Sequence, residues 1–274
     1  MADLKVSVAG VEFHNPLIAA SGTFGFGREY AEFYPLSALG GISSKGITLK
    51  ARPGNPAPRI AEAPGGMLNA VGLQNPGVDH FIEKDLPWLR EQGVTIIANI
   101  AGNTPEDYCA MAEKLNDTDI DMIEMNISCP NVKQGGVQFG TSCAGVEDIT
   151  KAVRAHCKKP LMVKLSPNVT DISEIALAAE SAGADAVSMI NTLTGMRIDI
   201  NTKRPIIHNN TGGFSGPALL PIAVRMVWQT YQKVKIPIVG LGGISTWQDA
   251  VEMLLAGATA LQIGTVLFTD PYAP

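Results

Sequence analysis

Short apolar runs alternate with amphipathic segments along most of this chain. Eight runs have the length of buried strands and lie at residues 17–24, 41–48, 95–101, 122–128, 161–166, 186–191, 236–241 and 260–265. Between them, helical periodicity and helix-end signals predict helices at 105–115, 146–156, 172–182, 217–234 and 246–256. Buried strands that alternate with helices form a parallel sheet, and eight such units suggest closure into a barrel. We therefore expect an α/β protein with the (β/α)8 TIM-barrel fold.

Three segments lie outside this alternation. Residues 4–13 alternate around a turn, which predicts an N-terminal β-hairpin that covers the bottom of the barrel. Residues 50–79 are rich in Pro and Gly, and we expect them to form a long loop that walls the active site. Residues 268–274 are too few for the last barrel helix, so we expect the chain to be shortened at its C-terminus. A length of 274 residues suits one barrel domain over residues 1–274, since such barrels need about 250 residues.

Composition narrows the class of protein. Hydrophobic residues make up 46% of the chain and charged residues 17%, which is enough apolar surface for a large core. The net charge is −5, and no run of Lys and Arg suggests a nucleic-acid partner. The most apolar stretch, 251–268, is interrupted by Glu252, Gln262 and a Gly257-Ala258 break, so it predicts a helix and a strand rather than a membrane span. Because the N-terminus has no apolar signal region, we expect a cytoplasmic protein without a membrane partner.

The cysteines do not form a metal-binding pattern. They stand at positions 109, 129, 143 and 157, which is neither a C-x-x-C pair nor a common zinc or iron–sulfur spacing. We therefore expect no metal site, and free thiols in a reducing compartment.

Cys129 lies in the segment Asn-Ile-Ser-Cys-Pro-Asn-Val-Lys, where a strand-like run gives way to a glycine-rich loop. A lone cysteine is more often a small buried hydrophobic residue than a catalyst. The carboxyl end of a parallel strand, however, faces the ligand in α/β folds, and two neighbouring Asn side chains add hydrogen-bonding capacity. This position favours chemistry over packing.

Glycine-rich loops follow the last two strands. Residues 240–246 read Gly-Leu-Gly-Gly-Ile-Ser-Thr and open a helix, with Asp249 as a capping-box partner of Thr246. Residues 263–265 read Ile-Gly-Thr. Glycines also make plain tight turns, but two such loops in consecutive barrel units favour a phosphate site. This pattern does not distinguish a sugar phosphate from flavin mononucleotide.

Two lysines lie in or at the end of apolar strands. Lys164 interrupts the run 161–165, where a cation needs an electron-rich partner. Three roles are open: a Schiff-base amine, a fixed positive charge beside a cofactor that becomes anionic on reduction, or a structural ion pair with Glu124. Lys45 has the same ambiguity.

Amides cluster at the predicted strand ends, where the sequence has Asn69, Asn99, Asn126, Asn131 and Asn191. One such Asn is most simply a turn residue. Five on one rim suggest a planar ligand with several carbonyl and N–H groups, because an amide both donates and accepts. A pyrimidine fits this description.

The order of these motifs resembles the dihydroorotate dehydrogenase family, in its class 1B, NAD-linked form. The matching pieces are Ala-Ser-Gly-Thr-Phe-Gly at 20–25, Ser-Lys-Gly at 44–46, Asn-Ala-Val-Gly-Leu-Gln-Asn-Pro-Gly at 69–77, Asn-Ile-Ser-Cys-Pro-Asn at 126–131, Gly-Gly at 242–243 and Ile-Gly-Thr at 263–265. The class assignment rests on the short continuation Lys-Gln-Gly-Gly at 133–136.

This resemblance implies flavin mononucleotide at the barrel mouth and oxidation of dihydroorotate to orotate in pyrimidine (UMP) biosynthesis. Cys129 would remove the proton from C5, and the hydride from C6 would go to flavin N5. The implied substrate residues are Lys45, Asn69, Ala70, Val71, Gly72, Leu73, Asn126, Asn131, Asn191 and Thr192. The implied flavin residues are Ser21, Lys45, Gly46, Asn99, Asn126, Lys164, Ile190, Gly216, Gly242, Gly243, Gly264 and Thr265.

The same resemblance implies a partner subunit. In class 1B enzymes a second subunit carries FAD and a 2Fe-2S cluster and passes electrons to NAD+, in a heterotetramer of two catalytic and two electron-transfer subunits. This sequence has neither a cluster spacing nor a Rossmann fingerprint, so it would need that subunit. The alternatives are a fumarate-dependent class 1A enzyme, a flavin-dependent dihydropyrimidine dehydrogenase and, more remotely, a Schiff-base aldolase that uses Lys164.

Overall fold

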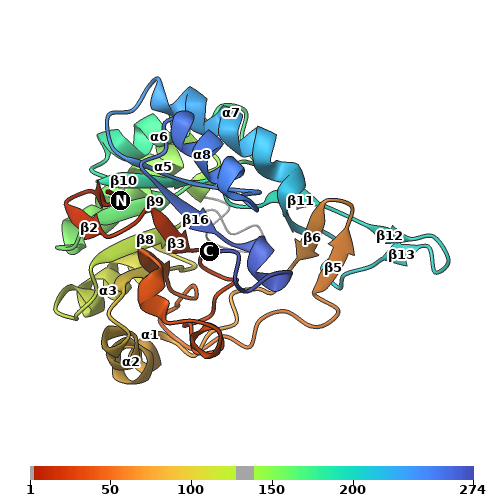
Figure 1. Cartoon of the computed structure of the whole chain (residues 1–274), viewed down its shortest axis with the longest axis horizontal. Coiled ribbons are helices and arrows are strands. Elements are labelled where there is room, and N and C mark those ends of the chain that lie inside the picture. The colour runs from red at the N-terminus through yellow and green to blue at the C-terminus, as the bar shows by residue number, and fades with distance from the viewer. Residues whose placement is uncertain (1–2, 128–138) are drawn as a thin grey trace.

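The computed structural model describes residues 3–127 and 139–274, and it has at its centre a closed barrel of parallel strands (Figure 1). Its eight strands are β3 (Leu17–Ala19), β4 (Gly41–Ser43), β7 (Thr95–Ile100), β8 (Met122–Asn126), β9 (Leu161–Lys164), β10 (Ala186–Met189), β15 (Ile238–Leu241) and β16 (Ala260–Ile263). Each lies inside one of the apolar runs, so the TIM-barrel prediction is confirmed. Most strands end before their apolar run does, because the last residues of these runs already belong to the loops above the barrel.

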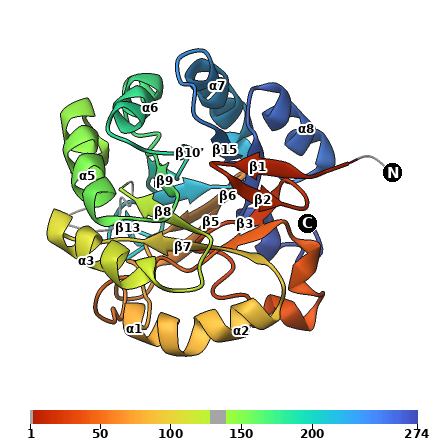
Figure 2. The same ribbon diagram turned by 90° about the vertical axis from the view of Figure 1, so that its left-hand side faces the viewer.

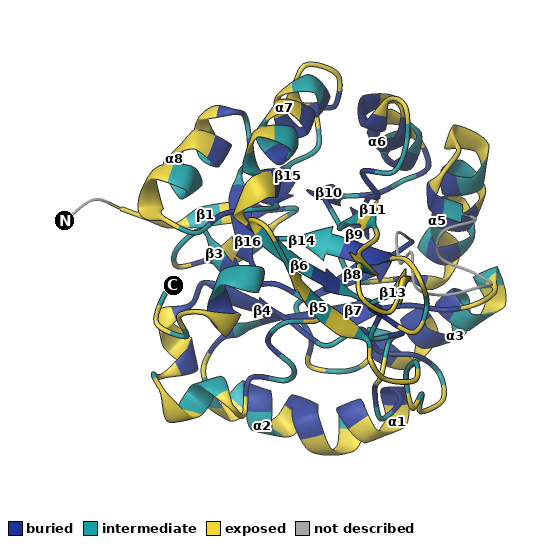
Figure 3. Ribbon diagram, turned by 90° about the vertical axis from the view of Figure 1, so that its right-hand side faces the viewer, coloured by how far each residue is buried: buried dark blue, intermediate teal, exposed yellow. Residues whose placement is uncertain are grey.

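Helices surround the barrel, and their exposed residues face outward (Figure 3). They are α1 (Val78–His80), a π-helical turn (Phe81–Asp85), α2 (Leu86–Glu91), α3 (Pro105–Asn116), α5 (Cys143–His156), α6 (Ile172–Ser181), α7 (Leu220–Tyr231) and α8 (Trp247–Leu255). Single 3-10 turns lie at Tyr30–Glu32, Leu36–Ala38, Pro217–Leu219 and Thr265–Phe268. In the described part of the chain, no helix combines the length and apolar character needed to cross a membrane.

Side chains that cap helices fix where several of them begin. Thr104 and Asp107 form a capping box at α3, and Thr246 and Asp249 form the predicted one at α8. The helix predicted at 217–234 instead begins with the 3-10 turn Pro217–Leu219. The capping pattern in the sequence therefore located the start of α8 correctly.

The N-terminal hairpin closes the bottom of the barrel, as predicted. Its strands β1 (Val6–Val8) and β2 (Val11–Phe13) pair antiparallel and lie across one end of the molecule (Figure 2). Val8 and Phe13 are buried against an apolar layer inside the barrel, formed by Ile18, Ile97, Met122, Met162, Ala186, Val239 and Ala260. These residues lie early in their strands, so this end of the barrel is filled with hydrocarbon.

Residues 50–79 contain regular secondary structure where the sequence predicted one long loop. They contain β5 (Ile60–Ala63) and β6 (Gly66–Asn69), which form a hairpin. The hairpin joins β14 (Gly212–Ser215) and β11 (Leu193–Gly195) in a four-stranded sheet, next to the small ribbon of β12 (Ile198–Asp199) and β13 (Arg204–Pro205). We call the four-stranded sheet the upper sheet, because it lies at the end of the barrel opposite the N-terminal hairpin (Figures 1 and 3). The prediction of a loop was wrong because β6 pairs with β14, a segment remote in sequence.

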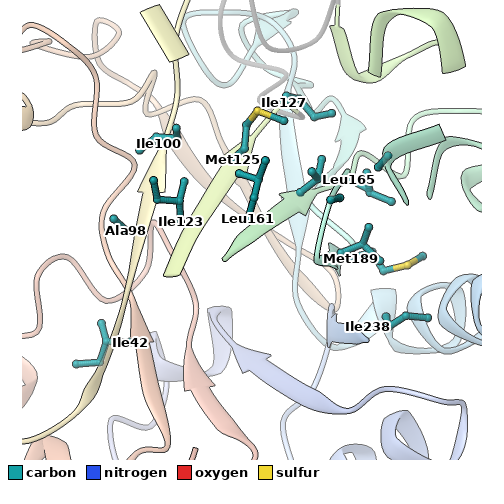
Figure 4. Close-up of a cluster of buried hydrophobic side chains, with 14 of the residues drawn as sticks. Ile42, Ala98, Ile100, Ile123, Met125, Ile127, Leu161, Leu165, Met189 and Ile238 are labelled. Carbon is teal, nitrogen blue, oxygen red and sulfur yellow. The ribbon is translucent and has the colours of Figure 1, made fainter. Parts of the chain in front are cut away.

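Alternation along the strands separates two environments. On β8, Ile123 and Met125 belong to the core that also contains Val146 and Tyr108 of the surrounding helices (Figure 4). Met122 belongs instead to the apolar layer inside the barrel, so Glu124, two residues on, also faces the barrel interior. The strand pattern thus places a carboxylate inside the barrel, where it is fully buried.

Candidate active site

A cavity of about 490 Å³ lies where the carboxyl ends of the barrel strands meet the upper sheet. The barrel contributes polar groups to its wall, including Asn126 at the end of β8 and Lys164 at the end of β9. The upper sheet contributes Met67 and Asn69 of β6 and Ser215 of β14. This is the face where TIM-barrel enzymes hold their substrates.

Most of the residues expected at the site are brought together in this cavity. Its wall includes Ser21, Lys45, Gly46, Asn69, Val71, Gly72, Leu73, Asn126, Lys164, Ile190, Asn191, Thr192, Gly216, Gly242, Gly243, Gly264 and Thr265. Ala70 and Asn99 are not part of the wall and are fully buried. Cys129 and Asn131 lie outside the described residues. Residues scattered over most of the chain thus surround one ligand-sized space.

Two glycine loops form one side of the cavity. Gly242 and Gly243 have φ values of 126° and 82°, in the region that favours glycine. A Cβ on Gly243 would lie 2.4 Å from the backbone nitrogen of Leu220, so no side chain fits there. Thr246 and Asp249 then cap α8, and the neighbouring strand β16 leads into Gly264 and Thr265. A glycine loop of this kind next to a helix N-terminus suits the phosphate predicted from the sequence, because its backbone can approach the anion closely.

Below the cavity, the barrel interior holds a second layer of side chains that is polar. We call it the interior polar layer, and it consists of Ser43, Asn99, Glu124, Lys164, Ser188 and Gln262, all buried. Each comes from a different strand of the barrel: β4, β7, β8, β9, β10 and β16. Large aliphatic residues usually fill such barrels, so a polar layer at this level calls for a chemical explanation.

Glu124 is the centre of the interior polar layer. Its Oε2 accepts hydrogen bonds from Ser43 Oγ at 2.5 Å and Asn99 Nδ2 at 2.6 Å. Its Oε1 accepts from Ser188 Oγ at 2.6 Å and Gln262 Nε2 at 2.7 Å. All four donors are uncharged, and together they satisfy both oxygens of the carboxylate.

Lys164 supplies the positive charge next to this carboxylate. Its Nζ lies 4.0 Å from Glu124 Oε2 and donates a hydrogen bond to Gln262 Oε1 at 3.3 Å. Burial by itself would raise the pKa of the Glu124 carboxyl, but the Lys164 ammonium and the hydrogen bonds from Ser188, Ser43 and Asn99 hold that pKa below its ordinary value. The ion pair considered from the sequence is present, and Lys164 also reaches the cavity wall.

Ser43, Ser188 and Gln262 were not predicted from the sequence as members of the interior polar layer. In the sequence, Gln262 is only a polar interruption of an apolar stretch. Ser43 and Ser188 lie in strand-like runs, and nothing else in the sequence indicates a role for them. Their relevance depends on contacts with Glu124, which is 138 residues from Gln262 and 81 from Ser43.

The polar atoms of the site fit a flat ring carrying N–H groups and a phosphate. Asn99 Oδ1 is buried and has no hydrogen-bond partner among the described residues. A Cβ on Gly46 would lie 3.1 Å from this oxygen, so Oδ1 lies against a glycine of the cavity wall. Together with the Gly242-Gly243 loop, this acceptor matches what a flavin mononucleotide requires of its site.

Comparison with known proteins agrees with this geometry. A family model described as dihydroorotate dehydrogenase matches residues 3–274. The dihydroorotate dehydrogenase B (NAD(+)), catalytic subunit, of Alkaliphilus metalliredigens is 58% identical over 271 residues, which cover 99% of this chain and 90% of that protein.

Proteins of the same name from other bacteria are similarly close. The Bacteroides thetaiotaomicron protein is 57% identical over 272 residues, covering 99% of this chain and 90% of its own length. The Petrotoga mobilis protein is 54% identical over 273 residues, covering 100% of this chain and 91% of its own length. These matches confirm the resemblance inferred from the motifs: the chain belongs to the dihydroorotate dehydrogenase family.

Proposed function

We propose that this chain oxidises dihydroorotate to orotate in pyrimidine (UMP) biosynthesis and binds flavin mononucleotide in the cavity above the barrel. The observation that carries the proposal is the convergence of amides, lysines and two glycine loops on one ligand-sized space. The relatives named above carry the corresponding activity in their names. One domain, comprising the barrel and the upper sheet, would hold substrate and flavin together.

The substrate residues of this proposal come from four parts of the fold. Lys45 follows β4, Asn69 ends β6, Asn126 ends β8 and Asn191 follows β10. The ammonium of Lys45 offers a countercharge for the orotate carboxylate, and the amides offer donors and acceptors to the pyrimidine ring. Asn131 and Thr192 complete the set, as do Val71, Gly72 and Leu73 of the cavity wall, whereas Ala70 is buried behind it.

Cys129 is the proposed base. A free thiol has a pKa of about 8.5, so a thiolate able to take the C5 proton is available near neutral pH with modest help. Flavin mononucleotide, when bound, supplies the acceptor for the hydride that leaves C6. Loss of the C5 proton and the C6 hydride leaves the double bond of orotate. The upper sheet limits the access of water from above, with Met67 and Ile60 in the cavity wall.

The flavin residues lie on the other side of the cavity. Lys164 would place its charge where the ring becomes negative on reduction. Gly242, Gly243, Gly264 and Thr265 would hold the phosphate, while Ser21, Gly46, Ile190 and Gly216 would form the walls around the ring. Asn99 would contribute its free acceptor.

The chain is proposed to work in the cytoplasm, together with a second subunit. The names of the relatives specify a catalytic subunit and NAD(+), which fits electron transfer to NAD+ through a separate polypeptide. We infer FAD and a 2Fe-2S cluster on that polypeptide, in a heterotetramer of two catalytic and two electron-transfer subunits. In the isolated chain, dihydroorotate should then bleach the flavin absorbance, but the reduced chain should transfer electrons neither to NAD+ nor to fumarate.

The test is an anaerobic visible spectrum of the purified chain before and after dihydroorotate is added. We expect a flavin absorbance that bleaches rapidly in the wild type and at least 100-fold more slowly in Cys129→Ser, because a serine hydroxyl is a far weaker base (about 10²–10⁴-fold for loss of base catalysis). Cys143→Ser is the matched control, since Cys143 is exposed on α5, and it should bleach like the wild type. A colourless protein, or a flavin that responds to dihydrouracil alone, would contradict the proposal.

A further inference from the structure

The amide of Asn99 is held in one orientation by Glu124. Asn99 Nδ2 donates to Glu124 Oε2 at 2.6 Å, and because a carboxylate only accepts, the nitrogen must face it. The oxygen Oδ1 therefore faces the other way, toward Gly46 of the cavity wall. With its side chain fully buried, Asn99 offers an acceptor, and not a donor, at this place.

Gln262 is oriented by the same carboxylate. Its Nε2 donates to Glu124 Oε1 at 2.7 Å, which leaves its Oε1 to accept from Lys164 Nζ at 3.3 Å. Glu124 thus fixes the direction of two amides, one through each of its oxygens. It also lies 4.0 Å from Lys164 Nζ, so it offsets part of the charge that Lys164 presents to the cavity.

A buried carboxylate destabilises a barrel interior, because its charge loses its hydration there. A hydrophobic side chain in the same place would pack at least as well. This desolvation penalty has an explanation if the carboxylate determines which atoms of the neighbouring amides donate hydrogen bonds and which accept them. Glu124 itself is fully buried and does not reach the cavity wall.

We propose that Glu124 is a positioning residue for the flavin: it keeps the acceptor of Asn99 directed at the cavity wall and limits the positive charge that Lys164 presents to the ring. The proposal rests on the proposed function for the identity of the ligand. It assigns to Glu124 a role in flavin affinity and reduction potential, without contact with the flavin or the substrate.

Glu124→Gln tests this role because the two side chains have nearly the same shape. The Gln amide replaces one carboxylate oxygen with a donor. If the donor takes the place of Oε2, Asn99 must turn its amide and present Nδ2 toward Gly46. If it takes the place of Oε1, Gln262 must turn, and its NH2 then opposes Lys164 Nζ. Either arrangement disturbs one amide, and both leave the charge of Lys164 uncompensated.

The expected result has two parts. Oxidised flavin should bind at least tenfold more weakly to Glu124→Gln than to the wild type, measured from the fluorescence of flavin released on dilution. The excess positive charge should favour the reduced flavin at least tenfold relative to the oxidised form. That ratio corresponds to a potential more positive by about 30 mV for a two-electron couple, measured by equilibration with a reference dye.

Ser188→Ala is the matched control. It removes a hydrogen bond to the same carboxylate but leaves the charges of Glu124 and Lys164 and both amide orientations in place. It should lower the melting temperature, while the flavin affinity and the preference for reduced over oxidised flavin each stay within threefold of the wild type. A merely structural role for Glu124 would make the two variants behave alike.

Glu124→Asp keeps the test decisive if Glu124→Gln does not fold. Its charge still balances Lys164, but its shorter side chain cannot hold Asn99 and Gln262 together, so flavin should bind at least tenfold more weakly. Folded Glu124→Gln or Glu124→Asp protein with the affinity and potential of the wild type would overturn the inference. A wild-type chain that binds no flavin would instead overturn the proposed function.

Discussion

The side-chain amide of Asn69 donates a hydrogen bond from Nδ2 to the backbone oxygen of Gly213, with 3.4 Å between the two atoms. The two residues are also register partners of β6 and β14, although 144 residues separate them. A Cβ on Gly213 would lie 2.0 Å from Thr192 Oγ1. The upper sheet therefore brings two of the proposed substrate residues, Asn69 and Thr192, to the same glycine.

Gly213→Ala should weaken substrate binding. The added methyl must displace the Thr192 side chain, because 2.0 Å is far below a normal contact. We expect the dihydroorotate concentration for half-maximal flavin bleaching to rise at least tenfold, with a loss of stability of about 1–3 kcal/mol from overpacking. Gly195→Ala adds the same methyl to the same sheet but meets the end of the Leu68 side chain at 3.0 Å and the Phe214 Cβ at an ordinary contact distance of 3.4 Å. It should leave this concentration unchanged; a similar rise in both variants would contradict the prediction.

Gly243→Ala should lose flavin. Its Cβ would lie 2.4 Å from the backbone nitrogen of Leu220, and the loop cannot relieve this contact without moving. The ratio of flavin to protein absorbance after purification should fall to less than a tenth of the wild-type ratio. Gly93→Ala introduces a side chain at a similar φ of 68° but with nothing within 4 Å. It should lose about 1 kcal/mol of stability from backbone strain and keep its flavin.

The two capping boxes offer a paired comparison. Thr104→Ala and Thr246→Ala each remove an oxygen that accepts a backbone N–H, from Asp107 and Asp249 respectively. Each should lower the free energy of unfolding by about 1 kcal/mol in urea titrations. Only Thr246 lies beside the Gly242-Gly243 loop, so only Thr246→Ala should also weaken flavin binding, by at least threefold. Equal flavin affinity in the two variants would argue against a phosphate at α8.

Acid should remove part of the stability that Glu124 provides. The pKa of Glu124 is lower in the folded protein than its ordinary value of about 4.3, so the ionised form is favoured by folding. Its contribution is fully present above that ordinary value and is lost as the pH falls through the lower, folded pKa.

This contribution is measurable by urea unfolding of the wild type and Glu124→Gln between pH 7 and pH 3. At pH 7 the variant should be less stable by about 3–5 kcal/mol, the usual cost of breaking a buried ion pair. The difference should shrink as the pH falls below about 4. A difference that stays constant over this range would show that the charge of Glu124 is not responsible.

Part of this molecule follows from the sequence because its determinants are local. The run around Ile123 and Met125 is short and apolar, which is enough to predict a buried strand. Thr246 and Asp249 lie within one helical turn, so the sequence was also sufficient to predict their capping box. The glycines after two successive strands indicated a ligand loop for the same reason.

Other features depended on segments that are far apart along the chain. The hairpin of Ile60–Ala63 and Gly66–Asn69 is stabilised by β14 and lies in a Pro- and Gly-rich region, so its sequence favoured a loop. The sequence likewise could not decide between a salt bridge and a ligand-facing role for Lys164. In the structure Lys164 pairs with Glu124 and also lines the cavity, because it lies between the two.

The sequence by itself determined the number of barrel strands, the closed α/β architecture and the end of the barrel at which the cavity lies, because hydrophobic periodicity and turn chemistry act over a few residues. Only the tertiary structure decided which polar residues meet inside the barrel. Ser43, Glu124 and Gln262 come together because parallel strands with staggered registers close into a ring. The direction of the Asn99 amide follows from that meeting, since it depends on which atom of Glu124 lies beside it.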